Sequence, residues 1–251
     1  MPRYSSLLGL KNVLNISIQS CEIKMNKREI VALLPMKAHS ERVKGKNFKN
    51  LAGKPLFRWI LDSLLAVKDL SKIVINTDAR HILKENGLRK SERIIIRDRK
   101  PELCGDFTSM NLILEDDIQA VAADLYLMTH TTNPLLSTQT IEAAIKKYDE
   151  TESADSLFTV NKFQTRFYRE DMSPVNHDPN NLIRTQDLEP WYEENSCLYI
   201  FTADSFATTK ARIGKKPVMM VTPVLESIDI DEPDDWVMAE VLAKGKYEKT
   251  N

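Results

Sequence analysis

The sequence Glu29-Ile-Val-Ala-Leu-Leu-Pro35 is a short apolar run between a charged residue and a proline. An apolar run without alternation is typical of a strand that is buried on both faces, as strands of parallel sheets are. Similar runs follow, separated by segments with helical periodicity. We expect strands at Lys72–Thr77, Arg93–Arg97, Asp124–Met128 and Ser156–Val160. We expect helices at Pro55–Leu65, Thr108–Ala123 and Thr138–Tyr148, and a further helix that follows Asp78, ends at about Asn86 and has Gly87 as its C-terminal cap. This alternation predicts an α/β fold with a doubly wound, mostly parallel sheet.

The alternation stops at residues 161–195, which contain several aromatic and arginine residues and three prolines. We interpret this segment as an inserted flap or small subdomain. Beyond it we expect strands at Cys197–Phe201 and Val218–Val221, and a closing helix from Pro233 to about Ala243. Residues 1–26 show no comparable pattern, and we interpret them as an extension, disordered or the product of a misassigned start codon near Met25. The remaining chain, 27–251, is expected to form one domain.

Composition excludes several classes of function. The 35 basic and 36 acidic residues nearly balance, so we expect no broad basic surface for nucleic acid. Neither GxGxxG nor GxxxxGK[ST] occurs among the 7 glycines, which excludes the two common glycine-rich phosphate loops. Three scattered cysteines and four histidines without HxxxH spacing make a disulfide framework or a zinc site unexpected. The apolar runs are too short to cross a bilayer and the N-terminus is a poor secretory signal, so we expect a cytoplasmic protein without membrane contact.

Polar clusters follow the apolar runs at points where a parallel sheet binds its ligands. They lie at Lys37–Asn47, Asn76–Asp78, His130–Asn133 and Asp229–Asp231. Ligands of open α/β sheets bind beyond the carboxyl ends of the strands, so we expect these four segments to converge on one site.

The basic loop Lys37–Lys54 has two interpretations, between which its chemistry does not decide. It is a solvated surface turn, or it is a cradle for a polyphosphate in which ammonium groups offset negative charge. The pair Asp229 and Asp231 is equally open. On an extended segment the two carboxylates share one face and suit Mg²⁺ held jointly with phosphates. Alternatively, Asp231 caps the helix that begins near Pro233.

Five motifs, taken together and in this order, resemble the acylneuraminate cytidylyltransferases, the CMP-sialic acid synthetase group. They are Leu34-Pro-Met-Lys-Ala-His-Ser-Glu-Arg-Val-Lys-Gly-Lys-Asn-Phe-Lys-Asn-Leu-Ala-Gly-Lys-Pro-Leu56, Asn76-Thr-Asp78, Thr131-Thr-Asn-Pro-Leu135, Asn195-Ser-Cys-Leu-Tyr-Ile200 and Ser227-Ile-Asp-Ile-Asp231. The resemblance extends from about Glu29 to Ala243. It implies the Rossmann-like fold of nucleotide-diphospho-sugar transferases, with a small inserted dimerisation subdomain.

The resemblance also implies an activity and a set of site residues. The activity is transfer of CMP from CTP to the anomeric hydroxyl of a 2-keto sugar acid, with release of pyrophosphate and without a covalent enzyme intermediate. The implied nucleotide-binding residues are Lys37, Ala38, Ser40, Arg42, Lys46, Asn47, Asp78, Arg99, Thr108 and Ser109. The implied sugar-binding residues are His130, Thr132, Arg184, Gln186, Asn195 and Tyr199. Asp229 and Asp231 are the implied Mg²⁺ ligands, and Lys37, Lys46 and Asp231 the implied catalytic residues. Family members are usually dimers in which the insertion reaches the partner's site.

Departures from the family pattern leave the acceptor open. Lys37 stands where the family usually has arginine, Glu41 where it has lysine, and His130 where it has glutamine. Arg42 could restore the charge that Glu41 removes. Because the family position of His130 touches the sugar, the acceptor could differ from N-acetylneuraminate. The alternatives are a cytidylyltransferase for a 3-deoxy-octulosonate or another sugar acid, and a nucleotide-binding module without catalysis.

Overall fold

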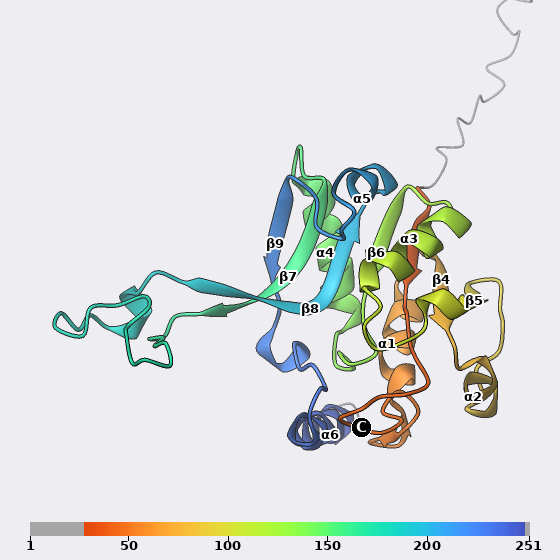
Figure 1. Ribbon diagram of the computed structural model, residues 1–251, viewed down its shortest axis with the longest axis horizontal. Helices are drawn as coiled ribbons and strands as arrows, with labels where there is room; N and C mark the ends of the chain where they lie inside the picture. Colours follow the sequence, from red (N-terminus) through yellow and green to blue (C-terminus); the bar gives the residue numbers. More distant parts are fainter. Residues whose placement is uncertain (1–27, 249–251) are drawn as a thin grey trace, which may run out of the picture.

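The computed structural model describes residues 28–248, and the extension 1–26 expected from the sequence lies outside them. Seven strands form one sheet in the order β5-β4-β1-β6-β8-β7-β9 (Figure 1). Their bounds are β1 Ile30–Leu33, β4 Leu70–Thr77, β5 Ile94–Asp98, β6 Leu125–Met128, β7 Ser156–Phe163, β8 Trp191–Phe201 and β9 Pro217–Val221. Within this sheet, β8 runs antiparallel to both of its neighbours and the remaining pairings are parallel. The mostly parallel sheet expected from the sequence is confirmed.

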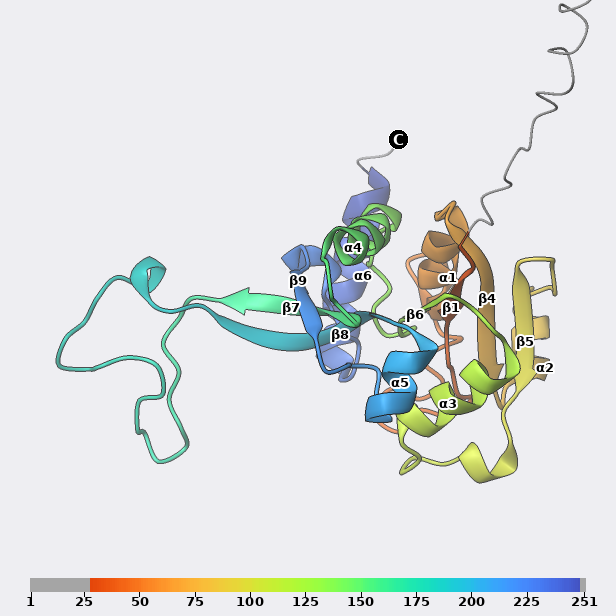
Figure 2. The same cartoon turned by 90° about the horizontal axis from the view of Figure 1, so that it is seen from above.

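Helices cover both faces of this sheet, as Figure 2 shows. Their bounds are α1 Leu56–Ala66, α2 Arg80–Glu85, α3 Met110–Ala120, α4 Thr138–Glu150, α5 Ala203–Thr209 and α6 Pro233–Glu248. Ala32 of β1 packs in one cluster with side chains of α1 and α4, whereas Val31 and Leu33 pack in another with side chains of α3 and α5. Successive side chains of a strand point to opposite faces, so the apolar run of β1 is buried on both sides as expected.

A third apolar cluster joins the basic loop to the C-terminal helix. The loop contains a short hairpin of β2 (Asn50–Leu51) and β3 (Lys54–Pro55). The cluster consists of Val43, Leu51, Leu56, Ile230, Trp236 and Ala239, with Trp59 and Ile228 packed against it. The loop is therefore held by apolar contacts with α6 and with the segment that precedes α6.

The inserted segment differs in form from the expected subdomain. Strand β7 was expected to end at Val160 but continues to Phe163, and β8 was expected to begin at Cys197 but begins at Trp191. The added residues form a two-stranded ribbon in which Phe163 pairs with Trp191. Residues 164–190 close this ribbon as a long loop with a 3-10 turn at Thr185–Asp187. We call residues 161–194 the arm, and it projects away from the sheet in both views (Figures 1 and 2). The stacked rings of Phe167 and Trp191 are part of its small aromatic cluster.

Most other elements agree with the sequence reading, with small shifts at their ends. Gly87 follows α2 with a φ of 81°, the left-handed conformation that favours glycine after a helix. The short helix α5 was not expected, and Ser227–Asp231 forms no strand. Within residues 28–248, no helix combines the length and apolar character that crossing a membrane requires.

Gly214 provides a test of packing at the edge of the sheet. A Cβ at Gly214 would lie 2.2 Å from Asp155 Oδ1 and 2.4 Å from Ser205 Oγ. The Asp155 carboxylate cannot move freely, because it accepts the backbone N–H groups of Lys215 and Lys216. We expect Gly214→Ala to lower the free energy of unfolding by about 1–3 kcal/mol, measured by urea denaturation.

The matched control is Gly245→Ala in α6, where an added Cβ meets no atom within 4 Å. Alanine has a higher helix propensity than glycine, so the free energy of unfolding of this variant should be unchanged or higher by up to about 1 kcal/mol. Equal stability of the two variants would contradict the tight contact at Gly214.

Candidate active site

Three of the four polar clusters expected at strand ends line a cleft of about 410 Å³, and Asp78 of the fourth is linked to it through Ala38. The cleft lies beyond the carboxyl ends of β1, β5 and β6, and the segment before α6 closes one side. Of the site residues expected from the sequence, it is lined by Lys37, Ser40, Lys46, Asn47, Arg99, Thr108, His130, Thr132, Asp229 and Asp231. A concave, polar site at this edge of an α/β sheet is where a ligand is expected.

Three hydrogen bonds hold the start of the basic loop in place, and they range from buried to exposed. The side-chain amide of Asn47 donates to the carbonyl of Lys37 over 2.8 Å, and the hydroxyl of Thr131 donates to Asn47 Oδ1 over 2.6 Å. The backbone N–H of Ala38 donates to Asp78 Oδ1 over 2.7 Å. Asn47 and Asp78 thus fix the loop against β6 and β4, and the solvated-turn interpretation does not describe this part of it.

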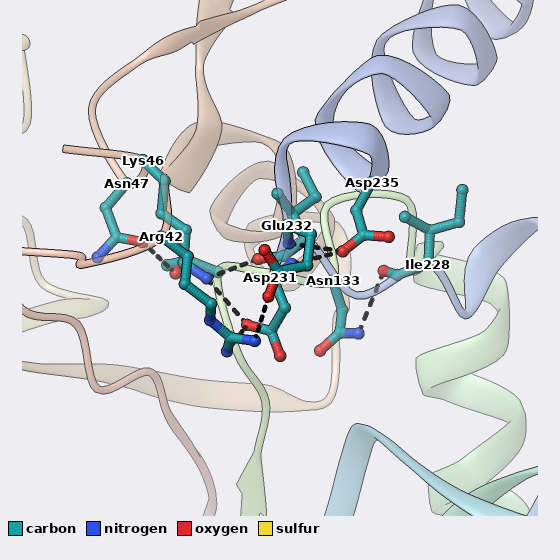
Figure 3. A network of polar contacts seen from close by, with 10 residues as sticks. Arg42, Lys46, Asn47, Asn133, Ile228, Asp231, Glu232 and Asp235 are labelled. Carbon is teal, nitrogen blue, oxygen red and sulfur yellow. Dashed lines mark hydrogen bonds and ion pairs between the residues drawn. The ribbon is translucent and has the colours of Figure 1, made fainter. Parts of the chain in front are cut away.

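Lys46 links the basic loop to the segment before α6. Its ammonium donates to the carbonyl of Ile230 over 2.6 Å and to Asp231 Oδ1 over 3.1 Å, as Figure 3 shows. Arg42 also reaches Asp231, at 3.1 Å, and Glu232, at 2.8 Å. Burial acts to raise the pKa of Asp231, but Lys46 and Arg42 outweigh it and hold the pKa below its usual range.

The helix-cap interpretation of Asp231 is wrong in this structure. The carboxylate that closes the start of α6 belongs to Asp235, which accepts the backbone N–H of Asp231 over 3.0 Å and that of Glu232 over 2.7 Å (Figure 3). An acidic residue in the first helical turn that bonds back to preceding N–H groups is the capping-box arrangement. The Asp231 side chain is therefore left to line the cleft.

Asp229 and Asp231 face the cleft together although no strand carries them. Ile230 between them is fully buried in the third cluster, and its N–H donates to the carbonyl of Thr132 over 2.9 Å. The two carboxylates thus line the cleft from a segment outside the sheet, while Ile230 between them packs in the core. Asp229 Oδ1 is buried without a hydrogen-bond partner. Burial, and secondarily the charge of Asp231, raise the pKa of Asp229.

This donor set suits a cation that is shared with a ligand. No group of three or more His, Cys, Asp or Glu side chains within residues 28–248 is placed to hold a metal. Two carboxylates, one with an orphaned oxygen, fit Mg²⁺, which binds through one or two carboxylates and completes its shell with phosphate oxygens and water. Asp229 and Asp231 are thus the residues that could hold it.

Arg99 lines the cleft and links the segments that follow β1 and β5 to the end of β4. Its guanidinium donates to the carbonyls of Met36, at 3.3 Å, and Asn76, at 3.0 Å, and to Asn76 Oδ1 at 3.0 Å. Burial lowers the pKa of Arg99, although arginine remains charged at neutral pH. On the same wall Thr108 lines the cleft, whereas Ser109 caps α3 by accepting the N–H of Asn111.

Asp106 is a cleft residue that the sequence analysis missed. It lines the cleft beside Gly105 and forms an ion pair with Lys37 across it. The pairing holds the pKa of Asp106 below its usual value. An acidic residue next to glycine in a loop after a strand is the signal that could have drawn attention to it.

Two of the expected sugar-binding residues lie behind the cleft wall. Asn195 is buried, donating to Asn161 Oδ1 at 3.0 Å and to Thr222 Oγ1 at 2.7 Å. Tyr199 is fully buried and its hydroxyl donates to Glu194. The residues that line the cleft at this point are Ser196 and Arg212, neither of which was expected as a site residue from the sequence.

The geometry of β8 explains this exchange. The pairing of β7 with β8 shifts register between Phe158 and Val160, and Ser196 has a φ of 57°. Such a bulge re-aims side chains relative to a regular strand. Arg212 had no local sequence signal, because it reaches the cleft from the loop after α5.

The last two expected residues, Arg184 and Gln186, belong to the arm and not to the cleft of their own chain. Arg184 forms hydrogen bonds with Asp187 at 2.7 Å and 3.2 Å, and the carbonyl of Gln186 accepts from Gln164. No residue of the arm lines the cleft. Arg42, Ala38 and Asp78 are placed beside the cleft through the contacts described above.

Comparison with known proteins is consistent with this geometry. A family model described as cytidylyltransferase matches residues 31–234. The chain belongs to the cytidylyltransferase family. It is thus a nucleotidyltransferase, and the resemblance expected from its motifs is confirmed.

Curated relatives of this cytidylyltransferase share modest identity. CMP-N,N'-diacetyllegionaminic acid synthase of Legionella pneumophila is 27% identical, with 85% of this chain and 95% of that protein covered. N-acylneuraminate cytidylyltransferase of Oncorhynchus mykiss is 29% identical over 85% of this chain, which spans 50% of that protein. Pseudaminic acid cytidylyltransferase of Campylobacter jejuni serotype O:2 is 22% identical, with 87% of this chain and 97% of that protein covered.

Solved structures support the fold of this cytidylyltransferase. 4-Diphosphocytidyl-2C-methyl-D-erythritol synthase of Anaerococcus prevotii aligns with a TM-score of 0.64 at 14% identity, covering 87% of this chain and 97% of that chain. A CMP:2-keto-3-deoxy-manno-octonic acid synthetase complexed with CTP aligns with a TM-score of 0.60 at 14% identity, covering 87% and 99%. At such identities the likeness bears on the fold alone.

His130 gives this cytidylyltransferase a pH-dependent stability. Burial, and then the charge of Arg212, lower the pKa of His130 to about 4. Between this value and about 6.5, the ordinary pKa of histidine, the unfolded chain binds a proton that the folded chain does not. Stability should therefore fall as the pH falls through this window. Between pH 7 and pH 5 the free energy of unfolding should fall by roughly 1–2 kcal/mol less in His130→Asn, whose side chain cannot be protonated, than in the wild type. Urea denaturation at the two pH values measures this difference. The same pH dependence in both proteins would contradict a lowered pKa.

Proposed function

We propose that this cytidylyltransferase transfers CMP from CTP to the anomeric hydroxyl of a nonulosonic acid, releasing pyrophosphate. The observation that carries the proposal is the cleft, where Lys37, Lys46, Asp229 and Asp231 share the lining. Lys46, and Arg42 from beside the cleft, form ion pairs with Asp231. The relatives named for legionaminic, neuraminic and pseudaminic acids support this class of acceptor. Because CTP is kept inside cells, we place the reaction in the cytoplasm.

In the proposed reaction the basic loop binds the triphosphate. Lys37 and Lys46 neutralise phosphate oxygens, and Ser40 and Asn47 line the same part of the cleft. Charge relief on the α-phosphate and on the departing pyrophosphate lowers the barrier to nucleotidyl transfer. Mg²⁺ held by Asp229 and Asp231 would supply further positive charge where the pyrophosphate departs. The acceptor hydroxyl attacks phosphorus directly, so no side chain is asked to form a covalent intermediate.

The nucleoside and the acceptor take the two remaining parts of the cleft. We assign the cytidine to the wall of Arg99 and Thr108, and the sugar acid to the wall of His130 and Thr132. A 3-deoxy-octulosonate is the alternative acceptor, since the acid group and the anomeric hydroxyl are common to both kinds of sugar. The departure at His130 leaves the substituents of the sugar to be determined by assay.

The arm is proposed to join two copies of the chain. Its side chains include large exposed apolar groups, namely Phe163, Tyr168, Met172, Leu182, Ile183, Trp191 and Tyr192. Aromatic, methionine and arginine residues are enriched at interfaces, and such a concentration on a projecting ribbon indicates burial against a partner. In such a dimer Arg184 and Gln186 would approach the partner's cleft.

The first test of this function is pyrophosphate release from CTP in the presence of Mg²⁺. We expect turnover with at least one of N-acetylneuraminate, N,N'-diacetyllegionaminate and pseudaminate, and less with 3-deoxy-octulosonate. Asp231→Asn should then lower kcat by about 10²–10³-fold, because it removes a full charge from the proposed metal shell. The matched control is Glu232→Gln, which also removes a partner of Arg42 and should retain nearly normal turnover.

Two results would contradict the assignment. Silence across all four acceptors, with CTP still bound, would favour a binding module over an enzyme of this specificity. A near-wild-type kcat for Asp231→Asn at saturating Mg²⁺ would leave this aspartate only a structural role, through its ion pairs with Lys46 and Arg42.

The arm gives a separate prediction on assembly. Replacing residues 164–190 by Asn-Gly joins the paired Phe163 and Trp191 through a two-residue turn suited to a hairpin. We expect the wild type to be a dimer by light scattering at micromolar concentration and the shortened protein to be a folded monomer. A monomeric wild type with full activity would refute the proposed role of the arm.

A further inference from the structure

Arg212 reaches the cleft from the loop that follows α5, opposite the basic loop. It lines the cleft with Ser196, His130 and Thr132. Its guanidinium carbon lies 4.0 Å from the centre of the Tyr199 ring, and its side chain is 22% exposed. A guanidinium stacked on an aromatic ring keeps its planar edge free to donate hydrogen bonds.

The contacts of Arg212 leave it donors for a ligand. Among the described residues it donates a long hydrogen bond to Glu194 Oε1, at 3.4 Å, and Glu194 also accepts from the hydroxyl of Tyr199. A guanidinium has five N–H donors in a fixed fork that matches a carboxylate. Its charge is felt inside the cleft, since it contributes to the lowered pKa of His130.

The position of Arg212 separates it from the residues assigned to the triphosphate. Lys37 and Lys46 come from the loop after β1, whereas Arg212 comes from the loop between α5 and β9 and contacts Glu194 and Tyr199 of β8. Its cleft neighbours His130 and Thr132 are the residues assigned above to the acceptor. The acceptor of the proposed reaction is an acid, whose carboxylate is ionised at neutral pH.

We propose that Arg212 binds the carboxylate of the acceptor sugar acid and thereby selects acids over neutral sugars. This inference rests on the proposed function. In the alternative, Arg184 would bind this carboxylate, but its guanidinium already donates two hydrogen bonds to Asp187 within the arm. A role of Arg212 in phosphate binding, by contrast, would appear in the Michaelis constant for CTP.

The experiment compares Arg212→Gln and Arg212→Lys with the wild type. The probe is whichever of N-acetylneuraminate, N,N'-diacetyllegionaminate and pseudaminate the wild type turns over best, together with its C1 amide. We expect Arg212→Gln to raise the acceptor KM about 10–100-fold while the CTP KM stays within twofold, since hydrogen bonds to a charged group are lost. Arg212→Lys, which keeps the charge without the fork, should fall between the two. The wild type should discriminate against the amide, and Arg212→Gln should treat acid and amide nearly alike.

Arg184→Gln tests the rival assignment, because it removes the guanidinium that the arm could bring to a partner's cleft. CTP binding by calorimetry and the melting temperature establish that each variant is folded. An acceptor KM within twofold of wild type in Arg212→Gln, with discrimination against the amide retained, would overturn the inference. So would a rise confined to the KM of CTP, or a rise in acceptor KM in Arg184→Gln alone. If the wild type turns over none of the three acids, the proposed function itself fails and the inference fails with it.

Discussion

The contact of Lys46 with Ile230 and Asp231 is the interaction on which the geometry of the cleft depends. It joins two segments 184 residues apart in the chain, and the lysine side chain is only 14% exposed. Partial burial strengthens the interaction relative to an exposed ion pair, which contributes little. Beneath it, Ile230 is packed with Leu51, Leu56 and Trp236, so one apolar side chain fixes the carboxylates on either side of it. The basic wall and the acidic pair are therefore held at a constant separation by a core and not by the ligand.

Several charged side chains at the cleft form ion pairs with one another in the protein alone. Asp231 pairs with Lys46 and Arg42, and Asp106 pairs with Lys37. In the proposed reaction a metal-bound triphosphate brings both signs of charge, so it can exchange with these pairs without leaving an unpaired charge behind. Lys37 and Asp106 are each about half exposed, so their pair is the weaker one to exchange, whereas Lys46 is held by a carbonyl as well as by a carboxylate. The loop is thus organised before the nucleotide arrives, which favours preorganised charge stabilisation.

The sequence predicted the parts of this structure that local physics determines. The uninterrupted apolar runs identified β1, β4, β5 and β6, because a strand buried on both faces has no other pattern. An apolar run does not indicate whether a strand runs parallel or antiparallel to its neighbours, so the antiparallel direction of β8 was not predicted. The ribbon was missed because Trp191–Glu194 are all exposed, so neither an apolar run nor an alternating pattern marks this part of the strand. In the site, the resemblance located the loop residues, but Asp106, Ser196 and Arg212 depend on long-range geometry. Asp235 took the capping role that spacing had equally allowed for Asp231.

The bulge at Ser196 connects the arm to the acceptor side of the cleft. Asn195 is buried against Asn161 and Thr222, which fixes the point where the ribbon leaves the sheet. One residue later Ser196 lines the cleft, and one residue earlier Glu194 pairs with Val160 and contacts Arg212. The root of the arm therefore supplies part of the wall that we assign to the sugar acid. A partner that fixes the ribbon would also act on Glu194, which contacts the guanidinium of Arg212 at 3.4 Å. Pairing of two arms would thus order the acceptor wall as well as bring Arg184 toward it, so the proposed dimer and the proposed acid selectivity depend on the same few residues of β8.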